Sequence, residues 1–196
     1  MYPEGGDLIA GYPNRLYIQA TLPNGKPADL AGKLIAKGSN GSITDVTVAE
    51  FATEHEGRGR IQFTPDANKE YFLTINEPAG IKTTYPLPQA KAAGALIRAE
   101  QDTFAKGQPV TVLVGASNQK FSVTLAKRET VISKCHVDLS KRSDVKAGTL
   151  LPITFVVPDD AEGVLTATIW SDKDVPLAER LIFRAPQHPL KVSITQ

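Results

Sequence analysis

The feature that most constrains the fold is a strand, a Pro-Asp corner and a returning strand between residues 57 and 75. Apolar and polar residues alternate from Arg60 to Thr64, which is the period of a half-buried β-strand. Pro65-Asp66 interrupts the alternation, and Tyr71 leads the segment that resumes it. A corner of this kind is typical of the connection between the two sheets of a β-sandwich.

The same unit returns later in the chain. Pro158-Asp159 repeats the Pro65-Asp66 corner at an offset of 158 − 65 = 93 residues. Gly107-x-Pro109 and the alternating residues after it match Gly11-x-Pro13 at an offset of 107 − 11 = 96 residues. Two landmarks with nearly equal offsets predict that one unit of about 95 residues occurs twice.

The sequence therefore predicts an all-β chain with two tandem immunoglobulin-like or fibronectin type III-like β-sandwich domains. The expected domains are residues 1–90 and 91–186, joined by a linker at Pro88–Gly94 that has little to bury. The apolar period-two spacing of Leu190–Ile194 predicts that residues 187–196 start a following strand or domain, so we expect a piece of a longer array. Strands are expected at 7–10, 15–20, 33–36, 47–53, 60–64, 71–75, 81–87, 95–102, 110–114, 121–126, 130–136, 150–157, 164–170 and 178–183.

Composition excludes several classes of function. Hydrophobic residues make up 41% and charged residues 22%, which is ordinary for a folded protein, and the net charge is +1. A neutral, evenly mixed chain does not indicate a nucleic acid partner, and no apolar run is long enough for this segment to insert into a membrane. The single cysteine excludes an internal disulfide and a multi-cysteine metal site.

Three motifs resemble catalytic ones, and each is better explained structurally. Cys135-His136 pairs a nucleophile with a base, but adjacent strand residues point to opposite faces, so we expect a small buried, unreactive thiol. His55-Glu56 lacks the second histidine of a zinc protease helix, and the Gly57-x-Gly59 that follows is expected in a bulge or tight turn rather than a phosphate loop. Gly115–Gln119 lacks the last glycine of a nucleophile elbow.

Other segments suggest binding or modification. Asp159-Asp160-x-Glu162 could offer oxygens to calcium, although acidic residues are common at corners, and whether an ion binds there stays open. Asn40-Gly41-Ser42 is a formal glycosylation acceptor, and Trp170 is expected in a core rather than on a carbohydrate platform. The sequence thus predicts no catalytic residue, no cofactor-binding residue, no metal site and no cofactor.

Several turn and strand-end motifs resemble macroglobulin-like domains of bacterial alpha-macroglobulin-type proteins. These motifs cover nearly the whole chain and are Tyr2-Pro3-Glu4-Gly5-Gly6-Asp7-Leu8, Gly25-Lys26-Pro27-Ala28-Asp29, His55-x-Gly57-x-Gly59-x-x-x-Phe63-Thr64-Pro65 with Tyr71, and Pro176-Leu177-Ala178-Glu179-Arg180-Leu181-Ile182-Phe183-Arg184. The resemblance implies an exported array of sandwiches in the periplasm or at the cell surface. It does not extend to a Cys-x-x-Gln thioester, because Cys135 is followed by His136, Val137 and Asp138.

On this basis the chain is expected to be a non-catalytic structural and interaction module rather than an enzyme. The resemblance implies neighbouring domains of the parent chain as partners, with a protease or cell-surface protein as a further partner if the parent is a protease-inhibitor scaffold. One alternative is an accessory sandwich of a carbohydrate-active or cell-surface protein, which would need an exposed aromatic row. Another is a hydrolase with an unrecognised site, which the three scattered histidines do not favour.

Overall fold

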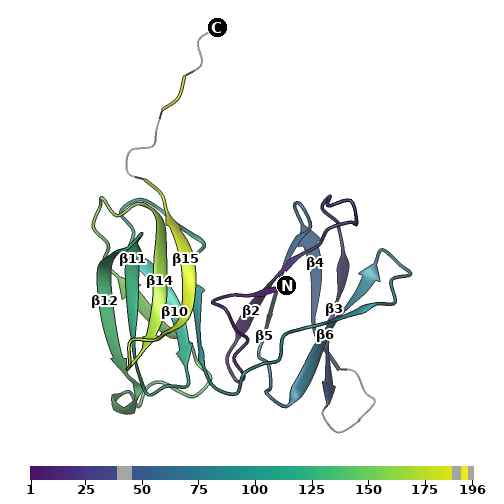
Figure 1. The fold of residues 1–196 in the computed structure, drawn as a ribbon, viewed down its shortest axis with the longest axis horizontal. Helices are drawn as coiled ribbons and strands as arrows, with labels where there is room; N and C mark the ends of the chain where they lie inside the picture. Colours follow the sequence, from purple (N-terminus) through teal and green to yellow (C-terminus); the bar gives the residue numbers. More distant parts are fainter. Residues whose placement is uncertain (39–45, 187–190, 194–196) are drawn as a thin grey trace.

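The computed structural model consists of two β-sandwiches that lie side by side (Figure 1). It describes residues 1–38, 46–186 and 191–193. One hydrophobic cluster gathers buried residues between Leu8 and Ala90, and a second gathers buried residues between Ala95 and Ile182. The immunoglobulin-like, all-β class predicted from the sequence is the observed one.

The first sandwich is a single hydrogen-bonded sheet that folds over itself. Its strand order is β1-β2-β5-β4-β3-β6-β7. Most of β4 pairs with β3, whereas its last residues, Thr53 and Glu54, pair with β5, so β4 passes from one layer to the other. The strands are β1 (Tyr2–Pro3), β2 (Asn14–Gln19), β3 (Ala31–Gly38), β4 (Val46–Glu54), β5 (Arg58–Phe63), β6 (Lys69–Glu77) and β7 (Thr84–Pro86).

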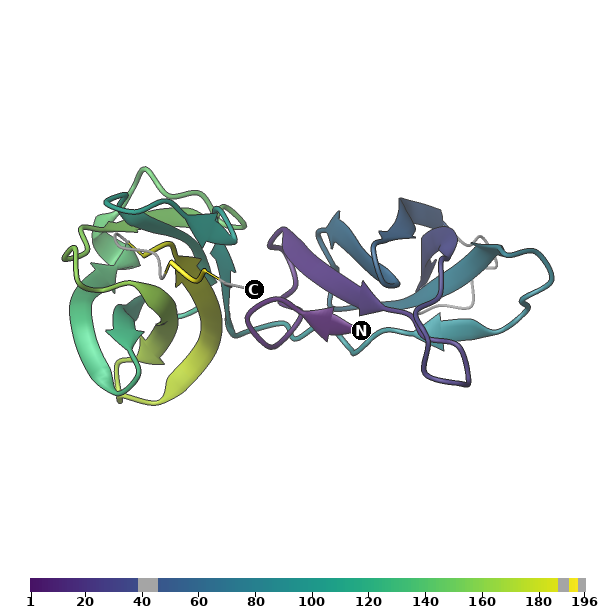
Figure 2. The same ribbon diagram turned by 90° about the horizontal axis from the view of Figure 1, so that it is seen from above.

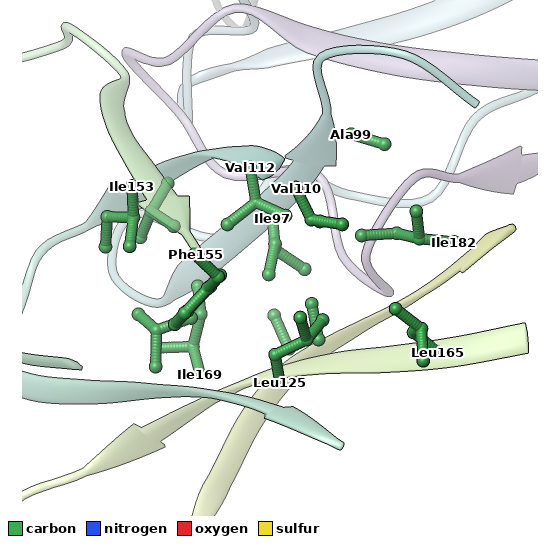
Figure 3. Packing of buried hydrophobic residues seen from close by; sticks show 14 of the residues in the cluster. Ile97, Ala99, Val110, Val112, Leu125, Ile153, Phe155, Leu165, Ile169 and Ile182 are labelled. Carbon is green, nitrogen blue, oxygen red and sulfur yellow. The ribbon is translucent and has the colours of Figure 1, made fainter. Parts of the chain in front are cut away.

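The second sandwich has two separate sheets, β13-β10-β8 and β12-β11-β14-β15-β9. Figure 2 looks along its strands, and Figure 3 shows the core between the sheets, where Val112 and Ile153 of one sheet face Leu125 and Ile169 of the other. Its elements are β8 (Ala95–Ala99), β9 (Thr103–Phe104), β10 (Val110–Ala116), β11 (Lys120–Lys127), β12 (Thr130–Asp138), the 3-10 helix η1 (Leu139–Lys141), β13 (Leu151–Phe155), β14 (Gly163–Ser171) and β15 (Pro176–Arg184).

The repeat landmarks occupy equivalent places in the two sandwiches. Gly11 and Gly107 both have positive φ, at 78° and 75°, in the turn before a buried strand. β2 begins at Asn14 and β10 begins at Val110, which is the same offset of 96 residues. The sequence repeat is therefore a repeat of structure around these turns.

The two Pro-Asp corners are held in different ways. In the first sandwich the buried Tyr71 hydroxyl accepts a hydrogen bond of 2.8 Å from the backbone N–H of Asp66. The Tyr71 ring also packs against Phe63, with 5.1 Å between ring centroids. In the second sandwich the corner is held by a buried arginine, Arg184, which donates to the backbone carbonyls of Pro158 and Ala161.

Replacing Tyr71 with phenylalanine is expected to destabilise the first sandwich by about 1–2 kcal/mol, because the Asp66 N–H loses its acceptor while the ring packing is kept. Urea unfolding measures the change. Tyr85→Phe is the matched control, since Tyr85 is exposed. A Tyr71→Phe variant as stable as this control would show that the hydroxyl does not hold the corner.

Three expectations about strands and the linker differ from the structure. Residues 7–10 form only an isolated bridge at Ile9, because the Asn14 side chain satisfies both the N–H and the carbonyl of Ile9, at 2.9 and 2.8 Å. The predicted linker contributes a buried residue, Ala90, to the first core. Lys91, in the middle of the predicted linker, forms a parallel β-bridge with Ile9, so the linker is attached to the first sandwich.

A third difference concerns β12, whereas the expected strand at the end of the chain falls largely outside the described residues. Alternation along 130–136 predicts that Val131 shares the face of Cys135, opposite Ile132. A register shift between Leu125 and Ala126 of β11 instead leaves Val131 of β12 exposed, whereas Ile132 packs against the core. Leu190 and Ile194 lie outside the described residues, and residues 191–193 are exposed and outside any strand.

Candidate functional site

The motifs around His55 form a turn. Glu56 and Gly57 both have positive φ, and Glu56 pairs with Arg58 at 3.1 Å on the surface. A Cβ on Gly57 would lie 2.2 Å from the carbonyl oxygen of Ala20, so this glycine is required by close backbone approach. The structural interpretation of this segment is the one that the structure supports.

Cys135 and His136 lie on opposite faces of β12. Cys135 pairs in register with Val123, whose side chain is in the core, and His136 pairs with Ser122 on the outer face. Cys135 is half-buried against the core rather than buried, because β12 is the edge strand of its sheet. Its Sγ contacts the backbone carbonyl of His136 at 3.9 Å, a geometry that does not activate the thiol.

The acidic corner already holds a cationic group. The Arg184 guanidinium donates to the carbonyl oxygens of Val157, Pro158 and Ala161, at 3.4, 2.6 and 3.0 Å, and lies 4.0 Å from the Asp159 carboxylate. These carbonyls are among the oxygens that a calcium ion at the corner would use. Within residues 1–38, 46–186 and 191–193, no group of three or more His, Cys, Asp or Glu side chains is placed to hold a metal ion.

Trp170 lies outside the core that was expected to contain it. Its neighbour Ile169 faces the core, so Trp170 lies on the outer face of β14 and is half-buried. Its indole N–H donates to Thr124 Oγ at 2.8 Å. Asn40, Gly41 and Ser42 lie outside the described residues, and Gly115 lies in β10 rather than in an elbow.

The candidate site that the structure itself reveals is the joint between the sandwiches, centred on Glu4. The side chain of Glu4 has no solvent exposure. Its Oε2 lies 3.2 Å from Arg15 Nη1 in its own sandwich, and its Oε1 accepts from Arg180 Nε of β15 at 2.9 Å. Oε1 also accepts from the backbone N–H of Ala99 in β8, at 3.2 Å. One carboxylate thus binds groups of both sandwiches. In Figure 1 the N-terminal segment extends from the first sandwich toward β15 of the second.

Arg180 extends this cluster to the surface. Its Nη2 donates to Asp102 at 2.8 Å and to the Tyr17 hydroxyl at 3.4 Å. The guanidinium also lies over the Tyr17 ring, 5.7 Å from its centroid. Arg180 therefore connects an acid of each sandwich and an aromatic ring of the first.

A second group of contacts flanks Glu4. Arg98 of β8 is buried and donates to the carbonyl of Pro13 at 3.1 Å and to the Gln62 side chain at 3.0 Å. Burial lowers the pKa of the Arg98 guanidinium from its ordinary value, and the nearby positive charge of Arg15 adds to this effect. The joint thus contains three positive charges, those of Arg15, Arg98 and Arg180. Glu4 is the buried carboxylate that compensates them.

Close packing completes the joint. The Tyr12 hydroxyl donates to the carbonyl of Ala116 at 2.7 Å, and burial raises the pKa of this hydroxyl. A Cβ on Gly115 would lie 2.7 Å from the Tyr12 ring, and a Cβ on Gly5 would lie 2.7 Å from the carbonyl oxygen of Ile97. These two glycines let the sandwiches approach at van der Waals distance. The joint thus combines an ion pair, hydrogen bonds and close backbone packing between the two sandwiches.

Sequence reasoning missed this joint. In the sequence Glu4 belongs only to the turn and strand-end motif Tyr2–Leu8, and its pairing with Arg15 could have been inferred only from the pairing of β1 with β2. Arg180 is 176 residues away from Glu4, and no local pattern signals that contact.

No helix within the described parts of the chain is long and apolar enough to cross a membrane.

Comparisons with known proteins give similarity in fold only. No family model and no curated protein matches the chain. Trypsin-activated alpha-2-macroglobulin from Escherichia coli is 14% identical over 93% of this chain and 16% of that chain, with a TM-score of 0.38. Salmonella alpha-2-macroglobulin reacted with methylamine is 12% identical over 91% of this chain and 16% of that chain, with a TM-score of 0.36. The BSP domain of a biofilm associated protein is 15% identical over 96% of this chain and 30% of that chain, with a TM-score of 0.39.

The chain therefore spans 16% of the length of these alpha-2-macroglobulin chains. Identities and TM-scores in this range carry no argument about activity or partners. The resemblance to macroglobulin-like domains, which rests on sequence motifs, stays a prediction beside the observed immunoglobulin-like fold.

Proposed function

We propose that this chain is a non-catalytic structural and interaction module, in which two sandwiches act as one rigid spacer between neighbouring domains. The observation that carries the proposal is the burial of Glu4 between Arg15 and Arg180. Removing one partner from a buried ion pair leaves an uncompensated charge, at a cost of about 3–5 kcal/mol. Separation of the sandwiches would break the Glu4–Arg180 pair together with the hydrogen bonds of Ala99, Arg98 and Tyr12 across the joint, so the joint favours a single relative orientation.

The parent protein is proposed to be exported to the periplasm or cell surface, where the spacer would serve a protease-inhibitor scaffold. Support comes from the sequence motifs that resemble macroglobulin-like domains, among them the lead-in that contains Glu4. The motif Tyr2–Leu8 thus contains two residues of the joint, Glu4 and Gly5. Neighbouring domains of the parent are the proposed partners, and a protease or a cell-surface protein would bind through the assembled array.

NMR relaxation tests the rigid spacer directly. We expect backbone amides of both sandwiches to report one rotational correlation time, that of a single 21.1 kDa body. Amides of 46–77 and of 110–138 provide matched sets, since both lie in strands of similar length. Two shorter and different correlation times would show that the sandwiches tumble independently, and the proposal would fail.

The non-catalytic part of the proposal has its own test. The purified chain is expected to leave protease activity unchanged and to bind no defined sugar on a glycan array. Catalytically inactivated proteases should be included, so that binding is separated from cleavage of the chain. Saturable inhibition of a protease or micromolar binding of a sugar would replace the spacer with a binding function.

A further inference from the structure

Residues 1–7, which we call the N-terminal segment, contact both sandwiches but belong to the core of neither. Neither hydrophobic cluster includes them, and Leu8 is the first core residue of the chain. The segment nevertheless supplies the buried carboxylate of the joint, that of Glu4, and a close backbone contact between Gly5 and Ile97 of β8. It is therefore part of the joint without being part of either folded body.

The N-terminal segment is held to its own sandwich by few contacts. β1 pairs with β2 at two residues, Tyr2 and Pro3. The Glu4 N–H donates to the Arg15 carbonyl at 2.8 Å, and the Asp7 carboxylate pairs with Lys91 on the surface at 2.6 Å. A pull on residue 1 loads these contacts one after another, so each resists the force alone.

The residues that follow are attached more firmly. Leu8 is 1% exposed in the first core, and its carbonyl accepts from the Lys91 N–H at 2.8 Å. Ile9 is also buried, and its N–H and carbonyl both bond to the buried Asn14 side chain. A pull on residue 1 is therefore expected to extract the chain as far as Leu8 and to leave the first core intact.

Removal of Glu4 reverses the charge balance of the joint. Its carboxylate lies between Arg15 of the first sandwich and Arg180 of the second. Burial and then the positive charge of Arg15 lower the pKa of the Arg98 guanidinium, so these two arginines already repel each other across the joint. Without Glu4 the three like charges face one another, and Arg180 keeps only Asp102 as an acidic partner.

The chain between the two bodies is short. Lys91 forms a bridge with Ile9 of the first sandwich. The Gly94 N–H and carbonyl both bond to Ser117 of the second sandwich. Ala92 and Ala93 are thus the residues about which the sandwiches would turn once the joint opens.

We propose that the N-terminal segment is a latch of the joint, which tension on residue 1 releases, so that the rigid spacer becomes two hinged sandwiches that both stay folded. The inference rests on the proposed function, because tension reaches residue 1 through a neighbouring domain. The released segment stays tethered at Leu8, so its effective concentration at the joint is high and the latch closes again when tension falls.

Single-molecule force spectroscopy of the full chain, with handles at residue 1 and at the C-terminus, tests the latch. The first event is expected to lengthen the chain by about 25 Å, since seven freed residues extend by about 3.5 Å each. Unfolding of either sandwich follows at higher force and releases roughly 300 Å, from about 90 residues. The short event should return after each relaxation. Its absence before the first unfolding event would overturn the inference.

The point of attachment is the control for this event. A handle at Asn24, in an exposed turn, leaves the N-terminal segment without load, so the short event is expected to vanish. Glu4→Gln is expected to raise the rate of release at a given force at least tenfold, whereas Glu50→Gln on the surface should leave it unchanged. A short event that persists with the Asn24 handle, or that Glu4→Gln does not affect, would exclude the latch.

Charge reversal tests the open state without force. Glu4→Lys adds a fourth positive charge to the three arginines and is expected to give two shorter, different correlation times in NMR relaxation, with the resonances of both cores unchanged. Glu50→Lys is the matched control and should keep one correlation time. A Glu4→Lys chain that still tumbles as one body would overturn the latch and leave the rigid spacer intact. Two correlation times in the unchanged chain would instead remove the spacer and the latch together.

Discussion

Substituting Arg184 with leucine is expected to destabilise the second sandwich by about 3 kcal/mol or more. The guanidinium is 1% exposed and is the hydrogen-bond donor to three backbone carbonyls of the corner, those of Val157, Pro158 and Ala161. Leucine fills part of the volume but leaves the Val157 and Ala161 carbonyls without this donor, whereas the Pro158 carbonyl keeps its bond from the Ala161 N–H at 3.1 Å. Each buried acceptor left without a donor costs about 1–3 kcal/mol. The loss would therefore exceed that of most single substitutions.

Urea unfolding monitored by Trp170 fluorescence measures this effect in the sandwich where it arises. Arg142→Leu is the matched control, because Arg142 pairs with Asp144 on the surface and its loss is expected to leave the stability nearly unchanged. Arg184→Lys should fall between the two, since an ammonium cannot reach all three carbonyls. Equal stability of Arg184→Leu and Arg142→Leu would mean that water replaces the guanidinium at the corner.

Substituting Glu4 with alanine is expected to lower the stability of the joint by about 3 kcal/mol. The change removes the shared acid from Arg15 and Arg180 and leaves the Ala99 N–H without its acceptor. Arg180 keeps its contact with Asp102, which limits the loss to the lower part of the range for broken buried pairs. Neither hydrophobic core contains Glu4, so both sandwiches are expected to stay folded.

Two probes of the same unfolding experiment separate these effects. Trp170 fluorescence reports the second sandwich alone, whereas far-ultraviolet circular dichroism reports both. We expect coincident transitions for the unchanged chain and separate transitions for Glu4→Ala. Glu50→Ala, which breaks the exposed pair with Lys33, is the control and should keep the transitions together. Coincident and unshifted transitions in Glu4→Ala would show that the joint does not couple the sandwiches.

The strands could be predicted because their signal is local. Apolar side chains at every second position, as in Leu16 and Ile18, are buried wherever a sheet has one face on a core, and the observed strands follow that period. The Pro65-Asp66 corner and the Tyr71 that follows it were likewise predictable from adjacent residues. The prediction that the domains divide near residue 90 rests on the same repeat and stays a prediction.

The features that sequence did not predict depend on partners far along the chain or on local irregularities. Arg184 reads as an ordinary alternating residue of β15, and only the folded corner shows the carbonyls that it binds. The register shift in β11 reverses which of Val131 and Ile132 is buried, and no residue type marks it. Trp170 is outside the core because its strand places it one position out of phase with Ile169.

The separation of 176 residues between Glu4 and Arg180 also sets an order of events during synthesis. The residues of the first core, which ends at Ala90, leave the ribosome well before Arg180 is made. At roughly 5–20 residues per second, the nascent first sandwich waits about 5–20 s with Glu4 paired only to Arg15. The surface that later becomes the joint is open to water and to other chains throughout this interval, so the last part of the chain to be translated determines when the two halves become one body.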